Sequence, residues 1–180
     1  MEGPGIPGPA AGGARGAALS APGARRDGRA PAGRRTGRTL NVYAESSAVL
    51  AWLLGESQAD QVLNALQEAS IVVASDLTLI EVDRALIRAT ILGEVPEAAA
   101  AEKRAALNEE ARYWYTMRVE DEIVERARRP FPGEPVRTLD ALHLASALVA
   151  NTRIARLALL SLDRRVRQAA RVLGIALVPS

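Results

Sequence analysis

Four carboxylates stand where the sequence changes from a strand-like to a helix-like pattern. Glu45 follows one short apolar run, and Glu81 lies in the helix pattern after the next. Asp140 begins an almost entirely apolar helix pattern, and Asp163 follows the strand pattern at 157–161. Sites in parallel α/β sheets form beyond the carboxyl ends of the strands. The sequence therefore predicts an acidic pocket in which these four acids meet.

Acids that share a pocket repel one another, and some must take up protons unless a cation joins them. Mg²⁺ and Mn²⁺ prefer oxygen ligands. Held by carboxylates, such an ion can lower the pKa of a bound water, orient a phosphate and offset charge on a leaving oxygen. The chain has no Cys, and its one histidine, His143, cannot build a His-rich metal site. The acids thus indicate metal-assisted phosphodiester hydrolysis.

Polar and basic residues accompany the acids. Arginines follow Glu81 and Asp163 along the chain and could hold a phosphate backbone. Ser46 and Ser161 are interpreted as local helix caps or, alternatively, as hydrogen-bond partners of metal-binding carboxylates. The predicted phosphate contacts are Arg84, Arg88, Arg164, Arg165 and Arg167.

Each acid also has a simpler explanation. Glu45 and Asp163 could cap helices, where an acid stabilises the helix dipole by roughly 0.3–1 kcal/mol. Asp140 could do the same, but its helix pattern is apolar on nearly all sides, and a buried acid needs a partner. His143 shares a helix face with Asp140, and we expect it to be a hydrogen-bonded structural residue.

Strand and helix patterns alternate after residue 39, which predicts a three-layer α/β/α sandwich around a mainly parallel sheet. We expect strands at 40–44, 71–75, 115–119, 157–161 and 175–178. We expect helices at 47–54, 58–68, 77–91, 97–114, 121–128, 139–150 and 163–173.

The composition divides the chain into a tail, 1–39, and a domain, 40–180. The tail contains ten of the 14 glycines and few large apolar residues, so we expect it to be disordered. Its seven arginines against two acids give it a net charge of +5, which leaves the domain at −3 and mildly acidic, unlike a basic nucleic-acid-binding domain. No apolar run is long enough to span a bilayer. We expect a cytoplasmic protein that does not engage a membrane.

The pattern resembles a PIN domain, and most of all the VapC-type toxins of toxin–antitoxin pairs. The likeness extends over about residues 40–180 and does not cover the tail. The segments that carry it are VYAESSAVLAWLLGE (42–56), VVASDLTLIEVDRAL (72–86), TLDALHLASAL (138–148) and LLSLDRRVRQAA (159–170).

The resemblance implies an α/β/α fold and Mg²⁺- or Mn²⁺-dependent ribonuclease activity on single-stranded or structured RNA. It also implies a homodimer and a cognate antitoxin whose C-terminal segment enters the acidic pocket. The arginines would then contact RNA. The family's acidic ligands fall on Glu45, Glu81, Asp140 and Asp163, and its associated polar residues on Ser46 and Ser161.

One position departs from the family pattern, because the first acid is usually Asp and here it is Glu45. The extra methylene moves the carboxylate by roughly 1.5 Å, and Mg²⁺ requires near-ideal geometry. Two alternatives therefore stay open. One is a catalytically weak binding module that docks a basic antitoxin or RNA segment. The other is a DNA-directed nuclease, which the absence of DNA-reading motifs disfavours.

Overall fold

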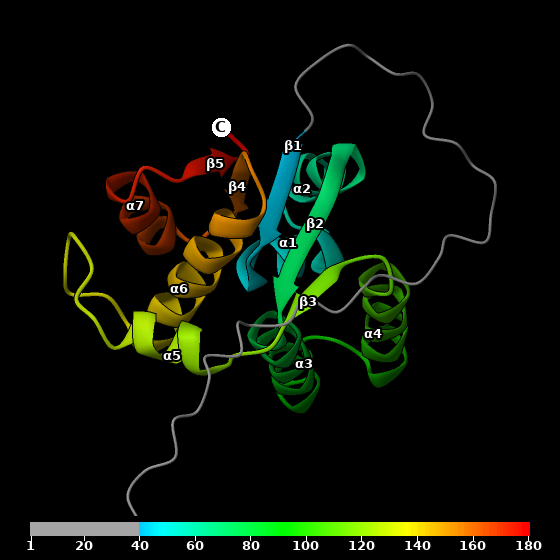
Figure 1. Cartoon of the computed structure of the whole chain (residues 1–180). Coiled ribbons are helices and arrows are strands. Elements are labelled where there is room, and N and C mark those ends of the chain that lie inside the picture. Colours follow the sequence, from blue (N-terminus) through cyan, green and yellow to red (C-terminus); the bar gives the residue numbers. More distant parts are fainter. Residues whose placement is uncertain (1–39) are drawn as a thin grey trace, which may run out of the picture.

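A computed structural model describes residues 40–180, and the predicted disordered tail, 1–39, lies outside the described residues. The strands form one sheet in the order β3–β2–β1–β4–β5, and every pairing is parallel. Figure 1 shows this sheet with helices on either side. The strands are β1 (Leu40–Ala44), β2 (Ala69–Ser75), β3 (Tyr115–Met117), β4 (Leu157–Leu160) and β5 (Ala176–Val178).

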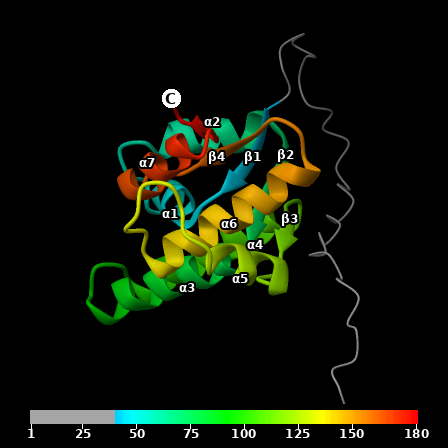
Figure 2. The same cartoon turned by 60° about the vertical axis from the view of Figure 1, so that its left-hand side comes forward.

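The helices cover both faces of the sheet, so the predicted three-layer sandwich is confirmed (Figure 2). Strand side chains alternate between two cores. Val42 and Ala44 pack with α1–α4, whereas Tyr43 packs with α5–α7. The helices are α1 (Ser46–Leu54), α2 (Ala59–Glu68), α3 (Asp76–Ile91), α4 (Glu97–Ala111), α5 (Asp121–Ala127), α6 (Thr138–Arg153) and α7 (Arg164–Val172).

The sequence suggests Thr138 as the cap before helix 139–150, Ser75 or Asp76 as the cap before helix 77–91, and Gly55 as the C-cap after helix 47–54. The side-chain caps expected at Thr138 and Ser75 are not formed. Thr138 is the first residue of α6, and Arg137 occupies the cap position without a side-chain bond. Ser75 occupies the cap position of α3 but makes no capping bond, because its Oγ instead accepts the hydroxyl proton of Tyr43 at 2.9 Å. A buried phenol needs a partner, and that need outweighs the cap. The predicted C-cap at Gly55 is confirmed, with φ of 69° and its N–H bonded to the end of α1.

Several element boundaries also differ from the prediction. β2 begins at Ala69, earlier than expected, where it pairs with Leu40 of β1. α4 ends at Ala111 and β3 at Met117, both earlier than expected. Within residues 40–180, no helix is long and apolar enough to cross a bilayer.

The sheet order places the carboxyl ends of β1 and β4 side by side. From β1 the chain builds β2 and β3 to one side, and it returns to the other side for β4 and β5. The backbone N–H of Glu45 donates to Leu160 O at 2.9 Å, which joins the two strand ends. Such a reversal of strand order is where parallel sheets form ligand sites.

The two cores predict how α6 contributes to stability. Leu144 of α6 is 0% exposed, whereas Leu139 of the same helix is 47% exposed. We expect Leu144→Ala to lower the free energy of unfolding by about 2–5 kcal/mol, since it leaves a cavity. Leu139→Ala, the matched control, should change it by less than about 0.5 kcal/mol. Urea unfolding measures both; equal losses would contradict this assignment of the core.

Candidate active site

Glu45 is buried at the start of α1, where it is both a helix cap and a centre of hydroxyl contacts. It is only 4% exposed. Its Oε2 accepts the backbone N–H of Ser47 at 3.1 Å, the hydroxyl of Ser47, and the hydroxyl of Ser161 at 2.8 Å. The Ser47 hydroxyl oxygen in turn accepts the backbone N–H groups of Leu162 and Asp163. The strand ends and α1 are therefore tied together through this carboxylate.

Ser46 stands between two carboxylates. Its Oγ lies 2.8 Å from Oε1 of Glu45 and 2.7 Å from Oε2 of Glu81. A serine hydroxyl has one proton to donate. At any moment, one of the two carboxylate oxygens therefore faces a lone pair of Oγ rather than its proton. The pair of acids is short of one proton or cation.

His143 lies beside this pair of acids. Its Nε2 lies 2.5 Å from Oε2 of Glu81 and 3.8 Å from Oε1 of Glu45, and its Nδ1 lies 3.2 Å from the hydroxyl of Tyr43. Tyr43 also donates its own hydroxyl proton to Ser75. The imidazole ring therefore connects the acid on α3 to the buried phenol of β1.

The ring and its neighbours set the ionisation of the site. Burial raises the pKa of Glu81. The hydrogen bonds with His143 and Ser46 and the charge of His143 lower it, and together they outweigh the effect of burial. The pKa of Glu81 thus lies below its ordinary value, and its carboxylate is ionised at neutral pH. Burial also raises the pKa of Tyr43, to about 12, so the phenol keeps its proton.

Asp140 and Asp163 lie at the same edge, but among the described residues neither belongs to the compact group. Asp163 caps α7, and its Oδ1 accepts the N–H groups of Arg165 at 2.7 Å and Val166 at 3.2 Å. Burial raises the pKa of Asp140, the negative charge of Asp163 raises it further, and Glu45 adds to the effect. Asp140 is half-buried, and the negative charges of the other acids act on it without direct contact.

The donor atoms fit a hard divalent cation. The ligand atoms of Glu45, Glu81 and His143 lie within 4.8 Å of one another. Nε2 of His143 is hydrogen-bonded to Glu81, so the donors that remain for a cation are carboxylate oxygens. Oxygen donors suit Mg²⁺ and Mn²⁺. A cation there would offset the negative charge of the two neighbouring acids.

The five predicted arginine contacts are placed differently from one another. Arg84 and Arg88 line a groove along α3 that begins at Glu81 and Ser46. Arg165 lines a second pocket, beside Asp140, and Arg164 next to it is exposed. Arg167 instead donates to Ser161 O and Pro179 O, both at 2.8 Å, and so holds the end of the chain to the sheet.

Two participants were not predicted from the sequence. Ser47 was expected only to begin a helix, yet its hydroxyl joins Glu45 to the backbone after β4. The pair of serines after the acid was the available signal. His143 is hydrogen-bonded, as expected, but its partner is the acid Glu81 of another helix. Spacing along α6 could not reveal that contact.

Comparisons with known proteins agree with this geometry. The family model described as "PIN domain" matches residues 42–172. Ribonuclease VapC46 of Mycobacterium tuberculosis is 32% identical over 137 residues, which cover 76% of this chain and 95% of that protein.

Solved structures agree in fold. The sarcin–ricin-loop-cleaving toxin VapC20 of M. tuberculosis matches with a TM-score of 0.52 and 16% identity, over 71% of this chain and 94% of that one. VapBC2 of Rickettsia felis, bound to a DNA fragment from its promoter, matches with a TM-score of 0.55 and 10% identity, over 76% and 96%. With its parallel sheet, its acids at the strand ends and the family match over most of its length, the chain belongs to the PIN domain family.

Proposed function

We propose that this chain is a metal-dependent endoribonuclease, the toxin of a type II toxin–antitoxin pair that acts in the cytoplasm. In this proposal residues 40–180 are the nuclease domain and 1–39 a disordered tail. The observation that carries it is the close pair of carboxylates around the single hydroxyl of Ser46, an arrangement that favours a cation at the sheet edge. The similarity to proteins named as VapC ribonucleases supports RNA as the substrate.

The metal, Mg²⁺ or Mn²⁺, would be held by Glu45 and Glu81, with Asp140 and Asp163 completing the set from α6 and α7. When bound, such an ion activates water and offsets charge on the phosphate. Oε1 of Glu45 is its more available oxygen, since Oε2 accepts bonds from Ser47 and Ser161. Glu81 uses Oε2 for Ser46 and His143, and we assign its Oε1 to the ion.

The chain's own residues orient these acids and receive the RNA. Ser46, Ser47 and Ser161 fix the Glu45 carboxylate, and His143 fixes that of Glu81. The RNA backbone would meet local arginines, because the domain as a whole is acidic. These proposed RNA contacts are Arg84, Arg88, Arg164 and Arg165. We omit Arg167, since its guanidinium is bonded to backbone carbonyls.

The groove along α3 is the surface that we assign to the antitoxin. It encloses about 860 Å³ and exposes apolar side chains, with Ile80 at 57%, Ile91 at 78% and Leu92 at 58%. Exposed apolar patches of this kind mark protein interaction sites. Glu81 at one end would attract a basic residue of the antitoxin. We also propose a homodimer, as in the toxins that the chain resembles.

One observation favours a second candidate, a binding module that cleaves poorly. Glu45 caps α1 and accepts hydroxyl protons on both oxygens, so much of its capacity is already used within the fold. In that case, the acids would serve chiefly to dock a basic segment of RNA or antitoxin.

Asp140→Asn tests the catalytic proposal. We expect cleavage of a labelled single-stranded RNA with Mn²⁺ or Mg²⁺ to fall by more than about 100-fold, because even indirect partners of metal ligands typically cost about 10–100-fold. Asp60→Asn, an exposed acid in the first turn of α2, is the control and should cleave like the wild type. Equal activity of Asp140→Asn and wild type would reject the role.

Metal binding separates the two candidates. We expect Mn²⁺ to bind saturably in titration calorimetry, and Glu81→Gln to weaken binding by about tenfold or more. Glu102→Gln, an exposed acid on α4, should bind like the wild type. A wild-type protein with no saturable binding at millimolar Mn²⁺ would favour the binding module instead.

Asp140→Asn should also stabilise the metal-free fold at neutral pH. Burial and Asp163 raise the pKa of Asp140, so the ionised carboxylate costs the folded state free energy. That cost is absent below the unfolded pKa, near 3.8, and complete above the raised folded pKa. Urea unfolding in EDTA should therefore give similar stabilities near about pH 3 and a more stable variant near about pH 7. A variant less stable at the higher pH would contradict the assignment.

A further inference from the structure

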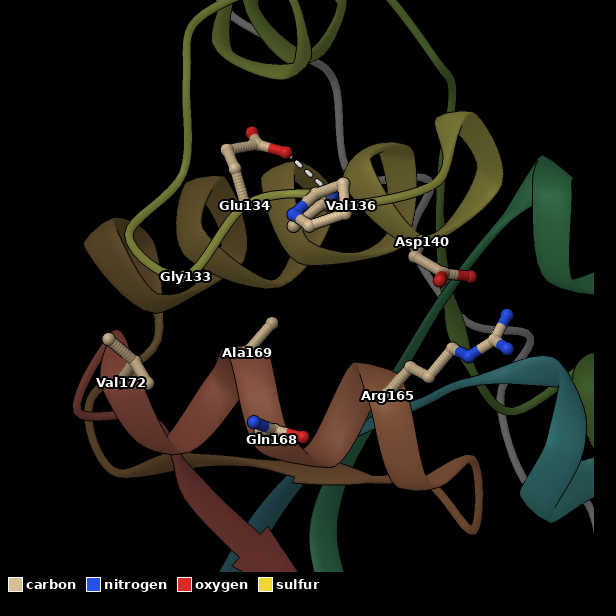
Figure 3. A pocket seen from close by; sticks show the side chains of 9 residues that line it. Gly133, Glu134, Val136, Asp140, Arg165, Gln168, Ala169 and Val172 are labelled. Carbon is tan, nitrogen blue, oxygen red and sulfur yellow. Dashed lines mark hydrogen bonds between the residues drawn. The ribbon is translucent and has the colours of Figure 1, made fainter.

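A narrow pocket, here called the slot, lies beside the acids, between the loop 133–136 and helix α7. It encloses about 320 Å³, at the lower end of the roughly 300–1,000 Å³ typical of small-molecule sites. Figure 3 shows the loop along one side of the slot and α7 along the other. The space suits one small ring system rather than a peptide helix.

The two long walls of the slot are partly apolar. Val136 lies on the loop side, and Ala169 and Val172 face it from α7 (Figure 3). At the far end the loop approaches α7 closely, since a Cβ on Gly133 would lie 4.0 Å from Val172 Cγ2. Gly133 has a φ of +87°, which glycine adopts most readily. The slot thus narrows toward Gly133 and Val172, and apolar side chains on both walls can contact a flat ring.

The loop wall is fixed by its own carboxylate. Glu134 accepts the backbone N–H of Phe131 at 3.0 Å and that of Val136 at 2.5 Å. These two bonds lower the pKa of Glu134, so the carboxylate stays ionised and keeps them at neutral pH. Phe131 itself is buried in the core against α6 and α7. The wall is therefore in place before any ligand arrives.

The other end of the slot opens toward the acidic centre. Asp140 of α6 and Arg165 of α7 lie opposite one another there (Figure 3). The negative charges of Asp163 and Glu45 both raise the pKa of Asp140, which places this acid near the others. A phosphate at that mouth would meet the guanidinium of Arg165 and lie next to the proposed metal ligands. A nucleoside joined to that phosphate would then point into the slot.

We propose that the slot receives one unpaired nucleoside of the RNA next to the bond that is cut, and that Gln168 reads its base edge. The inference rests on the proposed RNA-cleaving function. Gln168 lines the slot from the exposed side of α7, between Arg165 and Val172 along the helix, and its amide offers both a donor and an acceptor (Figure 3). Proteins recognise unpaired RNA bases through such edge contacts.

A base explains the composition of the slot better than a peptide segment does. Its walls carry small apolar groups for a ring face, whereas an amide group lines its length and an arginine stands at its mouth. These three features correspond to the face, edge and phosphate of one nucleotide. The antitoxin is assigned instead to the longer groove along α3.

RNA selection in EDTA tests the proposal without requiring cleavage. Full-length wild-type protein, Gln168→Ala and Gln67→Ala would each be incubated with a pool of RNA oligonucleotides that carry eight randomised positions, and the bound RNA sequenced. Gln67, an exposed glutamine on α2, is the matched control. We expect the wild type and Gln67→Ala to enrich one base at one position, and Gln168→Ala to lose about fivefold or more of that enrichment.

Two results would overturn the proposed role of the slot. One is the same base enrichment in Gln168→Ala as in the wild type, and the other is no base enrichment in the wild type. Cleavage assays with Mn²⁺ keep this outcome separate from the proposed function. RNA that is cut with unchanged base preference by Gln168→Ala would reject the slot and leave the nuclease standing. Selective binding that depends on Gln168, without cleavage by the wild type, would reject the nuclease and retain the slot.

Discussion

A shared proton at Ser46 is the constraint on which the whole site depends. The hydroxyl lies within hydrogen-bond distance of Glu45 and Glu81, yet it can satisfy only one of them fully. In water the two acids would simply separate. Here Glu45 begins α1 directly after β1, and Glu81 is held on α3, so the backbone keeps them together. Since the two acids cannot move apart, their negative charge must be balanced in place, which a bound cation can do.

The surrounding fold holds the two carboxylates close together. β1 and β4 are neighbours in the sheet, which brings Ser161 to within 2.8 Å of Glu45. Ser47 then bonds the backbone after β4, so α1 cannot turn without breaking contacts to another strand. The buried hydroxyl of Tyr43, itself bonded to Ser75, contacts Nδ1 of His143 and so orients the imidazole. Neutral hydroxyl groups thus hold the two carboxylates in place without cancelling their negative charge, as lysine or arginine partners would.

The sequence predicted the layers, the strands and the residue types of the site, but not how the side chains are shared. β-Branched runs and alternating patterns depend on local sequence, so the sandwich followed from them. Ser75 makes no capping bond, and its Oγ instead accepts the hydroxyl proton of a distant residue, Tyr43. The contact between His143 and Glu81 joins two helices far apart in sequence, and no spacing rule along α6 predicts it. Arg167 likewise cannot be told from Arg164 and Arg165 in the sequence, because its partners are backbone carbonyls that only the fold brings near it.

The longer acid at position 45 gains a physical explanation from these contacts. An N-cap carboxylate must bend back to reach the N–H of Ser47, and Glu45 does so with Oε2. The same oxygen takes the hydroxyls of Ser47 and Ser161, whereas Oε1 accepts only the shared proton of Ser46 within the described network. One oxygen therefore holds the fold, and the other remains for chemistry. Glu45 thus caps α1 with one oxygen and keeps the other at the sheet edge, so the departure from the usual Asp is compatible with a cation site there.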